Sequence, residues 1–318
     1  MTFDYFKSQH GLSRLMCMML VVAMSACVGK FETKPDFTEA CLIDWKTQAT
    51  IDESGLPSVS TGHRVHVLVW NIHDRLLGES AIAKGGHTEG EVVCIGEIAT
   101  RYDLVLFQEA YVRPAQIARY TNHAWSHHPV FEEGGGGDWW PLRAFCEICL
   151  TPGLLMLARE EPGPVYSEPY EAFAGWNTKR NKADDFFSKG FQLVNFEKFW
   201  ALNSHMDSGR GQASIDARVL QFRQITNALK RLVPQGAPLL IGMDSNLRSE
   251  QEPQDGKILE EFLEANGLTL VRHVGPDLIA VRNLQVENPQ VLPLKGVLSD
   301  HNALTVVIDP AVSGDPSR

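Results

Sequence analysis

The chain has 318 residues, of which 44% are hydrophobic and 21% are charged, and its formal net charge is −10. This length fits one large domain or two small ones with a sizeable core, and the composition is ordinary for a globular protein. The acidic balance argues against a protein that binds nucleic acid through a broad basic face, and it gives no sign of polybasic binding to membranes.

The first residues of the chain have the features of an export signal. A basic segment precedes an apolar run over 15–24, which is too short for a comfortable membrane span. Small residues then lead to Cys27 in a pattern that resembles a bacterial lipobox, in which the cysteine is lipidated. We predict a signal peptide over 1–26 and a lipid anchor at Cys27 in the bacterial envelope. The alternative is a plain cleaved signal, which would leave the protein periplasmic or secreted.

Export makes the cysteines informative, because disulfides persist outside the cytoplasm. Four cysteines remain after Cys27 in the mature chain: Cys41, Cys94, Cys146 and Cys149. We expect disulfides among them, with a pairing that the sequence does not define. The Cys146–Cys149 pair suits a local disulfide or, with His127 or His128, one half of a zinc site.

The rest of the chain is organised as a lead-in, one large domain and a tail. Residues 27–60 are polar and interrupted by proline and glycine, which predicts a tether. One domain is expected over 61–311, followed by a C-terminal tail over 312–318. Within the domain, apolar runs of strand type alternate with helical patterns.

Strands are predicted over 65–70, 104–107, 153–158, 190–194, 199–203, 238–242, 268–271, 278–281 and 303–308. Helices are predicted over 92–102, 215–232 and 259–265. The alternation of strands and helices, with some strands in pairs, predicts a layered α/β protein.

Polar side chains recur directly after the predicted strands, or directly before the last one. They are Asn71, Glu109, His205, Asp244, Asn246, Asp300 and His301. Each residue taken alone would more often be a turn former, a helix cap or a structural histidine. Because strand ends in layered α/β folds present side chains to a common cleft, we expect the whole set to form one site.

The residue types in this set suit cleavage of a phosphate ester. Glu109 and the amide oxygen of Asn71 are ligands that Mg²⁺ prefers, and Mn²⁺ is the alternative ion. His205 and Asn246 can donate hydrogen bonds to phosphoryl oxygens, on which charge must be stabilised.

A general base is also required to activate the attacking water. His301 suits this role if a carboxylate orients it and stabilises its charge. Asp244 or Asp300 could provide that carboxylate, and we expect the two acids to divide the orientation of the base and the binding of the metal between them.

These segments resemble the motifs of the endonuclease/exonuclease/phosphatase superfamily, which has the DNase-I-like fold. The similar segments run in order from about 64 to 309: 69–73, 103–109, 153–159, 189–191, 203–206, 242–246, 277–279 and 299–301. The Ser-Asp-His segment at 299–301 matches without change, whereas 242–246 has one residue more than the usual Gly-Asp-Phe-Asn.

The resemblance implies a four-layered α/β sandwich of two packed mixed sheets flanked by helices, with Mg²⁺-dependent hydrolysis. It implies metal binding by Asn71, Glu109 and Asp300, and a base at His301. It also implies that His205, Asp244 and Asn246 complete the catalytic set. The chain would then be an exported lipoprotein member of the superfamily, and we expect it to be a monomer.

The substrate is not defined by these motifs, because members of the superfamily cleave nucleic acids, lipid headgroups and small phosphates. Export and acidic charge favour a phosphodiesterase or phosphatase acting on lipid headgroups or small phosphoesters. Trp139-Trp140, beside the glycine run 134–137, would suit a membrane interface, or these tryptophans pack against the domain. The basic cluster 179–182 would hold an anionic phosphate or is a solvated loop.

Two other functions remain open from the sequence. The first alternative is a secreted or envelope nuclease, for which nucleic acid would be the partner; the acidic charge disfavours it. The second is a non-catalytic lipoprotein that uses the fold for binding, against which the retention of every core site residue argues.

Overall fold

The computed structural model describes residues 64–74, 87–131, 151–174, 188–248, 252–296 and 298–310. All of them belong to the unit Thr38–Arg318. Outside the described residues lie the signal peptide, the lipid anchor at Cys27, the tether over 27–60, the tryptophan pair, the glycine run, the basic cluster and the tail. The predictions about these segments therefore stay predictions.

Cys94 is disulfide-bonded, in agreement with the disulfides expected among the cysteines. The other cysteines, and with them the predicted zinc alternative at Cys146 and Cys149, lie outside the described residues. Among the residues that the structure describes, no helix is long and apolar enough to cross a membrane.

The first sheet has six strands in the order β11-β12-β1-β2-β4-β3. Their bounds are β1 (Val65–Asp74), β2 (Leu104–Ala110), β3 (Trp125–His127), β4 (Leu155–Ala158), β11 (Gln285–Leu292) and β12 (Ala303–Asp309). β1 and β2 are parallel, whereas the other neighbouring strands are antiparallel. The sheet is therefore mixed, with its parallel pair at the centre.

The second sheet also has six strands, in the order β5-β6-β7-β8-β10-β9. Their bounds are β5 (Val165–Pro169), β6 (Gly190–Phe196), β7 (Phe199–His205), β8 (Leu239–Asp244), β9 (Thr269–Val274) and β10 (Asp277–Arg282). Its single parallel pair, β7 and β8, is again central.

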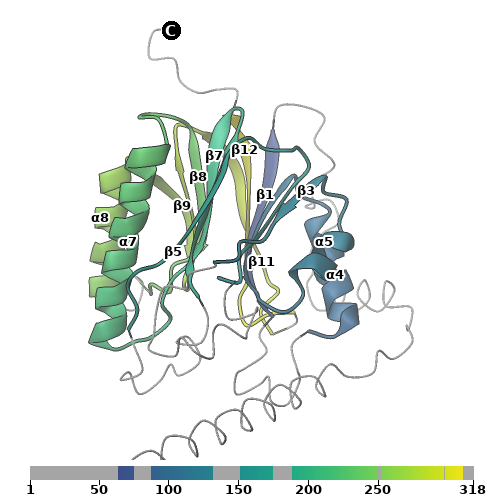
Figure 1. Cartoon of the computed structure of the whole chain (residues 1–318), viewed down its shortest axis with the longest axis horizontal. Helices are drawn as coiled ribbons and strands as arrows, with labels where there is room; N and C mark the ends of the chain where they lie inside the picture. Colours follow the sequence, from purple (N-terminus) through teal and green to yellow (C-terminus); the bar gives the residue numbers. More distant parts are fainter. Residues whose placement is uncertain are drawn as a thin grey trace, which may run out of the picture. The chain divides into compact units, whose positions relative to one another are not determined.

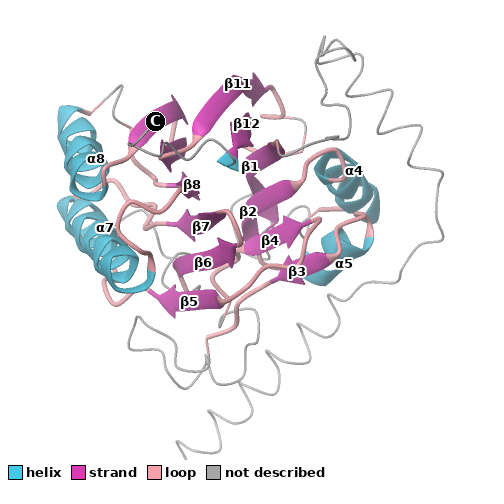
Figure 2. Ribbon diagram, turned by 90° about the horizontal axis from the view of Figure 1, so that it is seen from above, coloured by secondary structure: helices cyan, strands magenta, loops and turns pink. Residues whose placement is uncertain are grey.

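Helices cover the outer face of each sheet, so the described part of the chain has four layers (Figures 1 and 2). The helices are α4 (Glu89–Ala99), α5 (Pro114–Arg119), α7 (Gln212–Leu232) and α8 (Pro253–Asn266). α4 and α5 lie on the first sheet, and α7 and α8 lie on the second. This arrangement buries both faces of both sheets.

The ends of the helices follow from local sequence. Thr88 and Glu91 form a capping box at the start of α4, each side chain bonding the other's backbone N–H. α8 begins at Pro253, where proline needs no hydrogen-bond partner, and ends before Gly267, whose φ of 60° is easily adopted by glycine.

The core between the sheets is built from the strand residues that face inward. Val67 and Val69 of β1 belong to this inner cluster, whereas Leu68 and Trp70 of the same strand face α4 and α5. The sheets approach closely at Gly242 of β8, where an added Cβ would lie 2.5 Å from Val69 Cγ2. The absence of a side chain at this position therefore allows the two sheets to pack tightly.

The predicted fold class is confirmed, and each predicted strand and helix is present. Several strands are longer than predicted, so that Asn71, Glu109, His205 and Asp244 are strand residues and do not follow the strands. Four elements were not predicted: α5, β3, β5 and β11.

Candidate active site

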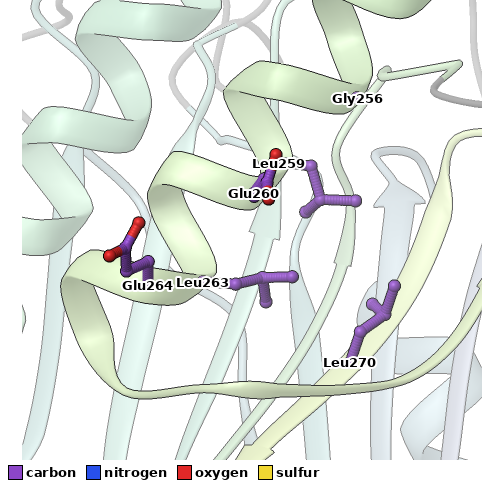
Figure 3. A pocket seen from close by; sticks show the side chains of 6 residues that line it. All are labelled: Gly256, Leu259, Glu260, Leu263, Glu264 and Leu270. Carbon is purple, nitrogen blue, oxygen red and sulfur yellow. The ribbon is translucent and has the colours of Figure 1, made fainter.

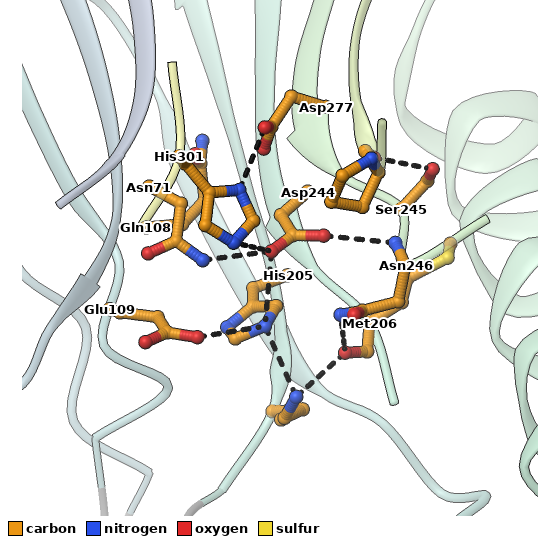
Figure 4. Close-up of polar contacts among 12 residues, drawn as sticks. Asn71, Gln108, Glu109, His205, Met206, Asp244, Ser245, Asn246, Asp277 and His301 are labelled. Atoms are coloured by element: carbon orange, nitrogen blue, oxygen red, sulfur yellow. Dashed lines mark hydrogen bonds and ion pairs between the residues drawn. The ribbon is translucent and has the colours of Figure 1, made fainter. Parts of the chain in front are cut away.

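The predicted polar residues meet at one end of the two sheets, and their contacts cross from sheet to sheet (Figure 4). Nδ2 of Asn71, in β1, donates a hydrogen bond to Oδ2 of Asp244, in β8, at 2.8 Å. Nε2 of His205, in β7, lies 3.5 Å from Oε1 of Glu109, in β2. All four side chains are almost completely buried. The site is thus formed where the sheets face each other.

The backbone at this end is strained. Glu109 and Asn246 have φ values of 57° and 53°, in the left-handed region that residues other than glycine rarely adopt. The N–H of Asn246 donates to Oδ1 of Asp244 at 2.9 Å, which holds the turn that follows β8. Such conformations persist only where surrounding contacts impose them, and they cluster at functional sites.

His301 is oriented by Asp277, at the start of β10. Nδ1 of His301 lies 2.7 Å from Oδ2 of Asp277, whereas Asp244 and Asp300 approach only Nε2, at 3.9 Å and 3.7 Å. The prediction that Asp244 or Asp300 orients this imidazole is therefore wrong. Asp277 appeared in the sequence only as part of a segment similar to the superfamily.

The charges of this pair are coupled. Burial raises the pKa of Asp277 to about 7, against the opposing effect of its hydrogen bond to His301. Burial alone would lower the pKa of His301, but Asp277, followed by Asp244 and Asp300, raises it to about 10. Because both pKa values are raised, the pair retains a proton through the neutral range and titrates as one unit.

Asp244 is the carboxylate that links the two halves of the site. Its Oδ2 accepts the bond from Asn71 and lies 3.6 Å from Nε2 of His205. Burial opposes its ionisation, but the imidazoles of His205 and His301 and the bond from Asn71 outweigh burial and lower its pKa. Asp244 is therefore ionised at neutral pH.

Lys189 is a buried residue of the site that was not predicted from the sequence. It is 1% exposed, and its Nζ donates to the carbonyl oxygen of Met206 at 2.7 Å and lies 3.2 Å from Nε2 of His205. Nδ2 of Asn246 donates to the same carbonyl at 2.9 Å. The only sequence signal for Lys189 was its place in the Lys-Gly segment at the start of β6.

Asp300 lies at the outer edge of the site. Its side chain is 55% exposed, and its Oδ1 lies 3.2 Å from Nδ1 of His73, which in turn lies 3.3 Å from Oε2 of Glu109. The structure therefore brings all seven predicted residues together, with Asp300 reaching Glu109 through His73. His73 was not predicted as a site residue.

The donor atoms fit a hard divalent cation. Ligand atoms of Glu109, His205 and Asp244 all lie within 4.8 Å of one another, as do those of Asp244, Asp277 and His301. Carboxylate oxygens buried at this distance repel one another unless a positive charge lies nearby. Oxygen-rich sets of this kind suit Mg²⁺ or Mn²⁺.

A separate depression of about 560 Å³ lies beside α8 (Figure 3). It is lined by Gly256, Leu259, Glu260, Leu263, Glu264 and Leu270. Leucines form part of its lining together with two glutamates, and carboxylates would repel an anionic phosphate ester. The strand-end site is the better candidate for phosphate chemistry.

Comparison with solved structures identifies the fold. No protein-family model matches the sequence, and no curated protein matches it. Sphingomyelinase C from Streptomyces griseocarneus is similar with a TM-score of 0.55 and 15% identity, over 77% of this chain and 99% of that one. A Staphylococcus aureus beta toxin variant with bound magnesium ions has a TM-score of 0.54 and 12% identity, over 76% and 98%.

A third similar structure is the endonuclease/exonuclease/phosphatase from Bacteroides vulgatus. Its TM-score is 0.54 at 13% identity, and the alignment covers 77% of this chain and 98% of that one. At these identities the likenesses show the fold alone. Together with the two mixed sheets and their flanking helices, they establish that the chain has the predicted DNase-I-like fold.

Proposed function

We propose that this protein is a metal-dependent phosphoester hydrolase that acts outside the cytoplasm. The observation that carries the proposal is the Asp277–His301 pair, joined at 2.7 Å beside the buried carboxylates of Glu109 and Asp244. An oriented imidazole next to an oxygen-rich cation site provides both a base and charge stabilisation.

The cation would be held by Glu109, with Asn71 and the acids Asp244 and Asp300 as further oxygen ligands. Oδ1 of Asn71 accepts one hydrogen bond, from the N–H of His73 at 3.0 Å, and keeps a second lone pair for a metal. When bound, Mg²⁺ or Mn²⁺ supplies Lewis-acid polarisation of a phosphoryl oxygen and compensates the buried negative charge.

His301 acts as the general base at Nε2. Asp277 holds Nδ1–H, which fixes the tautomer so that Nε2 is the atom that takes a proton from water. The carboxylates around His301 raise its pKa. A bound cation would compensate their negative charge, which would lower the pKa of His301 toward the range in which a base works at neutral pH.

The opposite side of the site would stabilise the phosphoryl group. His205, Lys189 and Asn246 lie together there, linked through the Met206 carbonyl and the 3.2 Å contact between Lys189 Nζ and His205 Nε2. The contacts of His205 and Lys189, which are buried, gain strength because little water competes with them.

Lipid headgroups or small phosphoesters are the proposed substrates, with anchoring at Cys27 or release after signal cleavage. Three observations support this location and substrate class: the export-type N-terminus, the acidic net charge, and the similarity of the fold to that of a sphingomyelinase. A membrane-anchored hydrolase would meet headgroups at the surface to which it is attached.

The test is a substrate panel on the purified mature protein. Sphingomyelin vesicles, plasmid DNA and a chromogenic phosphodiester should each be incubated with Mg²⁺, with Mn²⁺ and with EDTA. We expect cation-dependent hydrolysis of sphingomyelin or of the chromogenic diester, reduced by roughly 10²- to 10⁴-fold in His301→Ala because the base is absent.

Other outcomes have defined meanings. Cleavage of DNA alone would establish the nuclease alternative in place of lipid or small-molecule hydrolysis. No turnover of any phosphoester would support the non-catalytic binding protein. Full activity in His301→Ala would show that another group is the base.

A further inference from the structure

We propose that His73 is a positioning residue of the metal centre, which arranges Asn71, Glu109 and Asp300 and thereby sets the affinity for a divalent cation. This inference rests on the proposed function, because these three residues are the predicted metal ligands. His73 contacts all three of them.

The contacts of His73 are made by two different parts of the residue. Its backbone N–H donates to Oδ1 of Asn71 at 3.0 Å. Its Nδ1 lies 3.3 Å from Oε2 of Glu109 and 3.2 Å from Oδ1 of Asp300. The ring therefore stands between a fully buried carboxylate and one whose side chain is 55% exposed.

A bulge in β1 aims the ring at the site. Asn71 pairs with Gln108, and Asp74 pairs with Ala110. Ile72 and His73 of β1 therefore face a single residue of β2, Glu109. Ile72 is buried in the core, and His73 is turned toward the carboxylates. Bulges near active sites commonly redirect a side chain in this way.

The bulge is strained, and neighbouring groups hold it in place. His73 has a φ of 55°, in the left-handed region. The carbonyl oxygen of Ile72 lies 2.6 Å from Nε2 of His87, and the carboxylate of Asp74 accepts from the backbone N–H groups of His87 and Arg113. Strain that so many contacts maintain is typical of a functional position.

The position of the ring explains how it would act on the ligands. Asp300 lies on the turn before β12, and without a partner its exposed side chain would sample many rotamers. Nδ1 of His73 makes no well-aligned hydrogen bond to either carboxylate, but it lies within 3.3 Å of Oδ1 of Asp300 and Oε2 of Glu109. A polar ring atom at this place keeps the two carboxylates apart and holds both of them beside Asn71. Groups that orient metal ligands in this way strengthen metal binding although they do not bind the metal themselves.

The test is calorimetric titration of Mg²⁺ and Mn²⁺ into the mature protein and its variants, without substrate. His73→Ala should weaken cation binding by roughly 10- to 100-fold. His73→Asn should stay close to wild type, because Nδ2 of asparagine occupies the place of Nδ1 and asparagine tolerates left-handed backbone. A purely structural role for the ring would not give this rescue.

Asn288→Ala is the matched control. Asn288 has a φ of 50° within a register shift of the outer strand β11, so alanine there introduces the same backbone strain at another place. We expect it to bind both cations as the wild type does. If His73→Ala did not fold, His73→Leu and His73→Asn would give the same comparison between an apolar side chain and a donor.

Two results would overturn the inference: cation binding by His73→Ala at wild-type strength, or an equal loss in His73→Asn and His73→Ala. In either case the proposed function would stand, provided that the wild type binds the cation. If the wild type bound neither cation, the metal dependence in the proposed function and the role of His73 would both be wrong.

Discussion

At the scale of single residues, the pair formed by Asp277 and His301 determines the protonation of the site. Asp277 comes from β10 of one sheet, and His301 precedes β12 of the other. The negative partner raises the pKa of His301, and the same contact fixes which ring nitrogen faces the substrate side. The orientation and the pKa of the His301 imidazole therefore change together when Asp277 is replaced.

Replacing Asp277 with asparagine should alter the pH dependence of activity in a defined direction. Loss of the negative charge lowers the pKa of His301, so the acidic limb of log kcat/KM against pH should move to lower pH. The maximal rate should fall by roughly 10²- to 10⁴-fold, because the base is weaker and its tautomer is no longer fixed.

Asp309→Asn is the control for this experiment, because Asp309 lies at the other end of β12. It removes one carboxylate without touching His301 and should leave the profile unchanged. An acidic limb that stayed in place in Asp277→Asn would mean that a group other than His301 titrates.

The sequence indicated most of these residues but not their partners. Asn71, Glu109 and His205 were found because each stands at the end of an apolar strand. Asp277 was missed as a site residue because an acid after Gly-Pro is typical of a turn. Its role depends on a contact between two sheets, and no local pattern reports such a contact.

At the scale of elements, the close approach of the two sheets at Gly242 brings their strand ends together. A Cβ at this position would lie 2.5 Å from Val69 Cγ2 and 2.7 Å from Leu106 Cδ1. The two neighbours come from β1 and β2, the strands that carry Asn71 and Glu109. Packing at Gly242 therefore affects the spacing across the site.

Gly242→Ala should lower the free energy of unfolding by roughly 1–3 kcal/mol, because the extra methyl group overpacks the core between the sheets. Urea unfolding followed by circular dichroism measures this change. Gly163→Ala is the control: an added Cβ there meets only the Asn195 carbonyl, at 3.4 Å, and should change stability by no more than about 0.5 kcal/mol. Equal stability of the two variants would contradict the close packing.

The elements that escaped prediction share weak local patterns. β5 is half-buried along its whole length, so it lacks the alternation of buried and exposed residues. β11 lies at an edge and contains Pro289, which argues against a strand when read locally. β3 and α5 are too short for periodicity to be recognised.

At the scale of the whole domain, the site depends on the packing of two similar sheets. Each sheet has six strands with one central parallel pair, and the site residues of β1 and β2 face those of β7 and β8. The ordered motifs along the chain indicated this fold, because each motif lies in or beside a core strand. The distances across the interface depend on side-chain packing and could not be read from the motifs.

Glu109→Gln tests whether these residues form one metal-dependent hydrolytic site. The measurement is kcat/KM for the substrate that the panel identifies, against Mg²⁺ concentration, for the wild type and this variant. We expect EDTA to abolish wild-type activity, Mg²⁺ to restore it, and the variant to be at least roughly 100-fold slower at saturating Mg²⁺. Wild-type activity in Glu109→Gln, or activity that EDTA does not affect, would contradict this expectation.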